Sequence, residues 1–415
     1  MRLFPSLWLL ACAGALSAQT YSKDIAPIIQ EKCARCHRAG DIAPFPLTNF
    51  RQVSAYVEDI ARVVEERKMP PWKPVEGFGE FRDNFGLSAE ERELLLAWIR
   101  AGAPEGDPAD LPPAPPDADS PWHLGEPDLV LTAPEYTPPP EAKDTYRCFV
   151  LPVGLSETKY VLAVQALPGN PAIVHHVLFY IDETGASERL DARDPEPGYN
   201  CFGGPLIPLG IGSGLGGWAP GARAQPLPDG IAMLLPRTAR LVMQVHYYPQ
   251  GRVETDQTRV GLWFTDRERV KKRLVQIPIV NTRFEIPPGA DDYEVRAQQV
   301  VFPFLTGHAI TVAPHMHLLG KEIKVELIEP GGRVRPLIYI DRWDFNWQGF
   351  YTFTEPVRLP LLSTIRVTAR YDNSENNPNN PHRPLKPVRW GEGTEDEMCL
   401  AFLGVVFDAE FLAPL

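Results

Sequence analysis

The sequence carries no excess of positive charge: 41 lysines and arginines stand against 53 aspartates and glutamates, for a formal net charge of -12. Such a chain has few basic side chains with which to neutralise phosphates, so nucleic acid is not an expected partner. Long apolar runs are equally scarce. After residue 18 no segment approaches the roughly 20 apolar residues that cross a bilayer as a helix, so no transmembrane segment is expected.

Residues 1–18 have the pattern of a signal peptide, with Arg2 before an apolar run and the small residues Ser17 and Ala18 at its end. We therefore expect an exported, periplasmic or secreted protein. The alternative is a lipoprotein modified at Cys12. Removal of the first 18 residues leaves five of the six cysteines, an odd number, so in an oxidising compartment they cannot all pair with one another.

The composition predicts several domains, because 415 residues exceed one ordinary domain and 45 prolines indicate a loop-rich chain. Residues 19–103 carry helical spacing and predict a small all-α domain. Residues 104–125 are rich in proline and polar residues, which is typical of a semi-rigid linker. Beyond them, short alternating runs separated by turn residues predict two all-β antiparallel sandwiches, at residues 126–275 and 276–415.

The helical block contains Cys33-Ala34-Arg35-Cys36-His37, a CxxCH motif. Its two thiols can bond the vinyl groups of a haem while the adjacent imidazole ligates the iron. A zinc site would need further ligands in a pattern that is missing, and a redox CxxC would be expected beside a strand. The motif therefore predicts one covalently bound haem c.

The same block resembles small c-type cytochrome domains, through the segment 24–28 before the motif and through Trp98-Ile99 in a closing helix. A capping box of Ser88 and Glu91 predicts the start of that helix. The resemblance implies that Met69 is the second iron ligand; the alternative is a methionine that fills a gap in the core. Histidine and methionine together leave no position for O2, so this domain is expected to carry electrons.

Eight histidines remain, and two groups of them stand out. His315-Met316-His317 ends an apolar strand, where alternation puts both imidazoles on one face, although two ordinary polar residues would show the same pattern. His175-His176 lies inside a strongly apolar strand, and the pair could share a metal only at a bulge or a strand end. His246 could complete either group or be a single hydrogen-bonded histidine.

Five short motifs follow one another in a recognisable order: Asp144–Cys148, His175–His176, Gln244–Tyr247, His315–Lys321 and Asp396–Cys399. In wording and order they resemble the peptidylglycine α-hydroxylating and dopamine β-hydroxylating copper monooxygenases, over about residues 126–412. The resemblance implies two sequential, jelly-roll-like sandwich domains that each hold one copper across a solvent-filled cleft.

Matched residue by residue, the resemblance assigns two coppers to six ligands. His175, His176 and His246 would bind an electron-transferring copper, and His315, His317 and Met398 the copper at which O2 reacts. A thioether prefers Cu(I), so Met398 favours copper over zinc. The family's reaction inserts one oxygen atom of O2 into an activated C–H bond and consumes two electrons.

Other matched positions concern the substrate and the cysteines. Ala313 stands where peptide-amidating members have an arginine that anchors a carboxylate, so we expect a less charged, small organic substrate. Cys148 and Cys201 match a family disulfide, while Cys399 lacks its partner and is expected to be a buried free thiol. His308 also matches a family histidine, and we expect it either to support the copper ligands or to have a structural role. His123 and His382 are expected at the surface.

The leading hypothesis is an exported dicopper monooxygenase that receives electrons through its fused haem from an external donor, either ascorbate or a redox protein. The alternative is a non-catalytic copper-binding or electron-transfer protein with the same domains. In a third reading the haem accepts electrons from an oxidase-type reaction.

Overall fold

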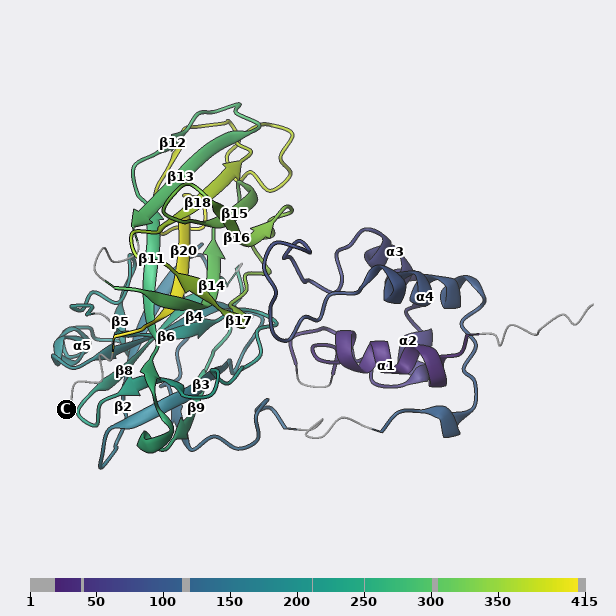
Figure 1. Cartoon of the computed structure of the whole chain (residues 1–415), viewed down its shortest axis with the longest axis horizontal. Coiled ribbons are helices and arrows are strands. Elements are labelled where there is room, and N and C mark those ends of the chain that lie inside the picture. Colours follow the sequence, from purple (N-terminus) through teal and green to yellow (C-terminus); the bar gives the residue numbers. More distant parts are fainter. Residues whose placement is uncertain are drawn as a thin grey trace, which may run out of the picture. The chain divides into compact units, whose positions relative to one another are not determined.

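The computed structural model describes residues 19–38, 41–113, 120–210, 212–249, 251–300 and 305–409. The expected signal peptide and part of the expected linker, residues 114–119, lie outside the described residues. By contacts the chain forms a helical unit, Met1–Pro70 with Phe85–Pro116, and a β unit, Pro71–Asn84 with Asp117–Leu415 (Figure 1). Among the described residues no helix is both long and apolar enough to cross a membrane.

The helical unit packs around a small apolar core. Its elements are η1 Tyr21–Ile25, α1 Ala26–Ile28, η2 Ile29–Cys33, α2 Phe50–Ser54, α3 Val57–Glu65, α4 Ala89–Arg100 and η3 Pro108–Asp110. Ile25, Leu95 and Trp98 are fully buried in the core. The predicted capping box is confirmed: the Ser88 hydroxyl accepts the N–H of Glu91, whose carboxylate accepts the N–H of Ser88. The predicted helical character is confirmed for this unit, whereas Pro71–Asn84, which was expected in the same all-α domain, belongs to the β unit.

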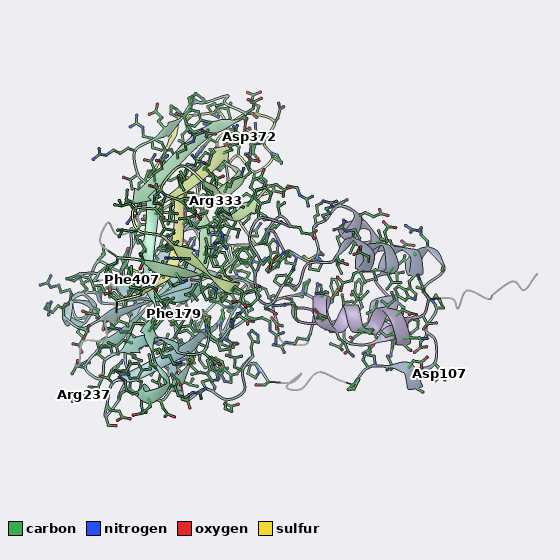
Figure 2. The ribbon with its side chains drawn as sticks, in the orientation of Figure 1. Asp107, Phe179, Arg237, Arg333, Asp372 and Phe407 are labelled. Atoms are coloured by element: carbon green, nitrogen blue, oxygen red, sulfur yellow. A yellow bond between two sulfur atoms is a disulfide. The ribbon has the colours of Figure 1, made fainter. Side chains whose placement is uncertain are left out.

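The first sandwich of the β unit consists of two five-stranded sheets. One has the order β1 (Leu129–Thr132), β9 (Arg259–Thr265), β3 (Lys159–Leu167), β7 (Ile231–Leu235) and β10 (Lys272–Arg273). The other has the order β5 (Tyr199–Asn200), β2 (Thr145–Pro152), β8 (Arg240–Tyr247), β4 (Val174–Asp182) and β6 (Gly214–Trp218). The pairs are antiparallel except β7 with β10. Phe179 of β4, labelled in Figure 2, belongs to the core that residues of both sheets share.

The second sandwich consists of two four-stranded sheets and a short pair. The sheets have the orders β11 (Val275–Asn281), β20 (Cys399–Phe407), β14 (Gly307–His315), β17 (Tyr351–Leu359), and β13 (Tyr293–Val300), β18 (Thr364–Tyr371), β15 (Gly320–Ile328), β16 (Val334–Ile340). The short pair is β12 (Glu285–Ile286) with β19 (Val388–Arg389). Burial alternates along β18, where Ile365 and Val367 enter the core and Arg366 does not, as expected for a strand with one face on the core. The predicted all-β character of this part is confirmed.

Strand β8 is the central strand of its sheet, and it carries the predicted site residue His246. Every residue from Leu241 to Tyr247 is buried, because a second small core covers the outer face of its sheet. That core includes the disulfide Cys148–Cys201, which joins β2 to the segment after β5. Beside it lies α5 (Ala186–Asp191), whose Ala186 and Leu190 pack against this core. His246 is therefore held in the interior, with 1% of its surface exposed.

Candidate metal centres

The first candidate centre is a group of three histidines on two neighbouring strands. His175 and His176 lie near the start of β4, and His246 lies near the end of β8. The pairing of these strands has an irregularity between Val174 and His176, which lets two consecutive imidazoles turn toward the same neighbour. One ligand nitrogen from each of the three lies within 4.8 Å of the others.

Burial keeps the imidazoles of His175 and His176 neutral. It holds the pKa of both His175 and His176 well below the ordinary value, and the neighbouring imidazoles lower each pKa further. A neutral imidazole is the form that can donate a lone pair to a metal. The buried Nε2 atom of His175 finds no hydrogen-bond partner among the described residues. A buried ring nitrogen without a hydrogen-bond partner, beside two other imidazoles, fits a borderline metal such as copper.

Asp144 orients the third histidine. Its carboxylate lies 2.7 Å from Nε2 of His246 and also accepts the N–H and hydroxyl of Thr394. Burial alone would raise the pKa of Asp144, but these hydrogen bonds outweigh it and lower the pKa to about 2. The ring of Tyr146 stacks on the imidazole of His246, and the two ring centroids lie 4.2 Å apart. Because Asp144 occupies Nε2 of His246, Nδ1 is the nitrogen of that ring that faces His176. It lies 3.3 Å from Nδ1 of His176.

The second candidate centre is built on the turn after β14. His315 and His317 have ring centroids 5.1 Å apart. Nδ1 of His315 meets the side-chain oxygen of Gln348 at 2.5 Å, and Nδ1 of His317 meets the carbonyl of Asp396 at 3.1 Å. Both contacts leave Nε2 as the nitrogen available to a metal. Burial lowers the pKa of His315 to about 4 and that of His317 to about 3.

Glu397 holds this turn against the segment that carries Met398, directly before β20. The side chain is fully buried and accepts three backbone N–H groups, from His317 at 2.9 Å, Leu319 at 2.6 Å and Met398 at 3.2 Å. Trp343 adds a further restraint, since its indole N–H donates to the carbonyl of His317 at 3.1 Å. Two of the predicted ligands, His317 and Met398, are therefore connected through Glu397, and His315 lies two residues before His317.

A cavity of about 280 Å³ opens onto both centres. His176, His315, His317 and Met398 line it together with Ala313. Most of its other lining is apolar: Leu178, Trp218, Val280, Phe350, Leu400 and Phe402. The described residues that line it include one carboxylate, Glu392, and no lysine or arginine.

The two centres are close neighbours. The rings of His176 and His315 lie 6.4 Å apart, edge to face. Phe345 stacks on His175 at 4.3 Å and also meets the ring of His317 at 5.9 Å. The resemblance implies two coppers across a solvent-filled cleft, whereas here aromatic packing brings the two sets of imidazoles together.

The residues predicted to hold haem lie in the helical unit. The N–H groups of Cys36 and His37 both donate to the carbonyl of Cys33, so the three side chains leave one tight turn, and neither thiol belongs to a disulfide. Nδ1 of His37 meets the carbonyl of Phe45 at 3.0 Å, which leaves Nε2 as the nitrogen for an iron. This turn fits a covalently attached haem. Met69 follows α3 on a separate segment, where its N–H donates to the carbonyl of Val63.

The remaining histidines have structural contacts. His308 faces Asp408 at 3.3 Å, and His123 accepts the N–H of Ala224. The expectation that His382 is a surface residue is wrong: it is 6% exposed, and its Nε2 meets the carbonyl of Glu395.

Sequence reasoning missed the side chains that surround the ligands. Asp144 and Glu397 lie inside two of the five motifs, Asp144–Cys148 and Asp396–Cys399. Their place in these motifs was the signal that could have indicated a role at the metal centres. Phe345 and Gln348 come from the loop between β16 and β17, and nothing in their local sequence points to a metal site.

Comparison with known proteins gives a family match for the second sandwich. Residues 276–406 match the family model described as "Copper type II ascorbate-dependent monooxygenase, C-terminal domain". This span contains the second sandwich with His315, His317 and Met398. At the level of class, the second sandwich is thus similar to the C-terminal domain of these copper monooxygenases.

Curated relatives extend the likeness. The protein named DBH-like monooxygenase protein 1 is 25% identical in Homo sapiens over 292 residues and 25% identical in Mus musculus over 291 residues. Each match covers 64% of this chain and 45% of the relative, so the chain spans less than half the length of the relatives it matches. Among solved structures, "Structure of infectious bursal disease virus Gx strain" covers 68% of this chain and 73% of its own at 8% identity, but its TM-score of 0.21 supports no conclusion.

Proposed function

We propose that this chain is an exported dicopper monooxygenase that hydroxylates an activated C–H bond of a small organic substrate with O2. The observation that carries the proposal is the pairing of two groups of imidazoles, one of them with a thioether, beside a single apolar cavity. The likeness of residues 276–406 to copper monooxygenases supports it.

The ligand sets suit different tasks. His175, His176 and His246 offer three imidazoles without a soft ligand, which serves a copper that transfers electrons. His315, His317 and Met398 would hold the second copper beside the cavity. When bound there, that copper supplies the reduction of O2, in which one oxygen atom enters the substrate and the other forms water at the cost of two electrons.

The chain's own residues select the substrate and exclude water. The apolar lining favours a hydrocarbon or aromatic body, and Ala313 provides no charge at the position where an arginine would bind a carboxylate. The described lining contains one carboxyl group, Glu392, and no lysine or arginine that would bind an anionic substrate. A neutral or basic substrate therefore fits better than a peptidyl-glycine.

Cys33, Cys36, His37 and Met69 would hold one haem c in the helical unit. Histidine and methionine ligation gives a haem that exchanges electrons and leaves no position for O2. An external donor, ascorbate or a redox protein, would reduce this haem, which would then supply the coppers.

The test is metal analysis followed by turnover. Protein matured in a host with cytochrome c assembly is expected to carry one covalent haem and two coppers, and His315→Ala with His317→Ala is expected to carry one copper. With ascorbate, O2 and a panel of neutral and basic aryl-alkyl compounds, the wild type should form hydroxylated product and this variant should form none. Two bound coppers with no product from any compound would favour the alternative, a non-catalytic electron-transfer protein.

A further inference from the structure

The segment Pro71–Asn84 belongs to the β unit, although residues of the helical unit flank it on both sides in the sequence. It joins two strands of the second sandwich through the backbone. Val75 donates its N–H to the carbonyl of Tyr339 at 2.8 Å, at the end of β16. Arg82 donates to the carbonyl of Thr352 at 2.8 Å, in β17. The segment is thus integrated into the sandwich.

Close packing holds this segment in a fixed position. Gly79 has a φ of +90°, and a Cβ placed there would lie 2.2 Å from the carbonyl oxygen of Leu337, so only glycine fits. Lys73, whose side chain is 13% exposed, pairs with Asp344 at 3.1 Å. Asp344 lies in the loop between β16 and β17, directly before the Phe345 that stacks on His175.

Aromatic side chains continue from this segment into the sandwich. Trp72 meets Tyr351 edge to face with ring centroids 5.4 Å apart, and Phe81 lies 5.3 Å from the same tyrosine. Tyr351 is 7% exposed. Its ring lies against the backbone of Gly349, where an added Cβ would come within 2.5 Å of the ring.

Gln348 completes the contact with the metal centre. It precedes Gly349, and its side-chain oxygen lies 2.5 Å from Nδ1 of His315. Ring contact, backbone and hydrogen bond therefore connect Trp72 to a ligand of the second centre without a gap. At the other end, Trp72 follows Met69 by three residues, so the extended chain keeps their Cα atoms within about 11 Å of each other.

We propose that Trp72 and Tyr351 form the electron route from the haem to the copper held by His315. The inference rests on the proposed function, because it needs both metals. In each passage the haem iron goes from Fe(II) to Fe(III) and the copper goes from Cu(II) to Cu(I). The copper held by His315 would pass the first electron on to the three-histidine copper, because the rings of His176 and His315 lie 6.4 Å apart, and would keep the second. Two passages would thus supply the two electrons of one hydroxylation, and an external one-electron donor would reduce the haem again after each.

The route assigns a role to residues outside both ligand sets. Electrons cross a protein fastest through bonded atoms and contacting π systems, and more slowly across gaps. Phe78 lies on the same segment but packs on Tyr339, with ring centroids 5.1 Å apart, and has no contact that leads to His315 among those described. It provides a matched control.

The experiment measures electron transfer within the holoprotein, without a substrate. Under anaerobic conditions, protein with both coppers oxidised receives one electron at the haem from a flash-generated reductant. Haem reoxidation is followed in the visible spectrum, and loss of the Cu(II) signal is followed by electron paramagnetic resonance. The variants are Trp72→Leu, Tyr351→Leu, Tyr351→Phe and the control Phe78→Leu.

Trp72→Leu and Tyr351→Leu are each expected to slow haem-to-copper transfer at least about tenfold, a barrier change of about 1.4 kcal/mol. Phe78→Leu should transfer at the wild-type rate, and Tyr351→Phe, which keeps the ring, should lose less than Tyr351→Leu. The haem spectrum, the copper content and the direct reduction of copper by dithionite should stay unchanged in all four variants. A residue with a merely structural role would alter these properties together with the transfer rate. Wild-type transfer in Trp72→Leu with both metals bound would overturn the route and leave the proposed function standing. Absence of haem or copper from the wild type would overturn both.

Discussion

The side chain of Met398 is 5% exposed and lines the cavity together with His315 and His317. It is the one sulfur assigned to either copper. Met398→Ile keeps a similar volume without a donor, so the free energy of unfolding should change by less than about 1.5 kcal/mol. Cu(I) affinity at the second centre should fall while the three-histidine centre stays filled. Titration with a competing Cu(I) chelator checks this, and two equally tight sites in the variant would refute the assignment.

Asp144 acts on the first centre through His246. A carboxylate bonded to the far nitrogen of a ligand histidine fixes its orientation, and removing such a partner commonly costs about 10- to 100-fold in metal affinity. Asp144→Ala should weaken copper binding at the three-histidine centre by that factor. Lys143→Ala, which changes the neighbouring exposed residue, is the control. Equal affinities in Asp144→Ala and the wild type would show that Asp144 only supports the fold.

At the scale of elements, Asp182 connects the end of β4 to α5. Its carboxylate accepts hydrogen bonds from the backbone and hydroxyl groups of Thr184 and Ser187. Burial would raise the pKa of Asp182, but these bonds outweigh it and lower the pKa to about 2. An unfolded aspartate titrates near about 3.9, so the stability that Asp182 contributes is complete above that pH and is lost as the pH falls toward 2. Asp182→Asn should therefore unfold more easily than the wild type at pH 6, and the difference should shrink at pH 3; a difference that grows with acid would contradict this sign.

The disulfide Cys148–Cys201 joins positions separated by 53 residues. Closing a loop of this length is expected to stabilise the folded state by about 4 kcal/mol through the entropy of the unfolded chain. Chemical denaturation of Cys148→Ala with Cys201→Ala should show a loss of this order. The buried free thiol Cys399 serves as a control. Reducing agent should lower the stability of a Cys399→Ser variant as much as it lowers that of the wild type. An unchanged midpoint on reduction would rule out a stabilising role for the disulfide.

At the scale of the whole molecule, local sequence patterns predicted the individual helices and strands better than they predicted which parts of the chain pack together. The capping box at Ser88 and short apolar strands such as β4 and β8 are encoded within a few residues, and the structure has them. The position of Pro71–Asn84 in the second sandwich depends on contacts with residues more than 250 positions away, so no local pattern shows it. Gln348 and Phe345 escaped prediction for the same reason, because only the folded loop between β16 and β17 brings them to His315 and His175.

For His382 the local sequence pattern predicted exposure, and the residue is buried. A lone histidine among prolines and asparagines resembles an exposed loop residue. Here the asparagines fold the loop onto itself, with Asn373 and Asn380 hydrogen-bonded to each other in the interior, and His382 is covered with them. Side-chain amides can satisfy buried backbone groups, which is why a polar segment can be packed inside.

Labelled oxygen tests the central claim most directly. Holoprotein with one haem and two coppers would be reduced, mixed with ¹⁸O₂ and a neutral or basic aryl-alkyl compound, and the products analysed by mass spectrometry. The account predicts one ¹⁸O atom per hydroxylated product and two electrons per turnover, with no labelled product from His315→Ala. Labelled product formed equally by His315→Ala would contradict the placement of the oxygen chemistry at this centre.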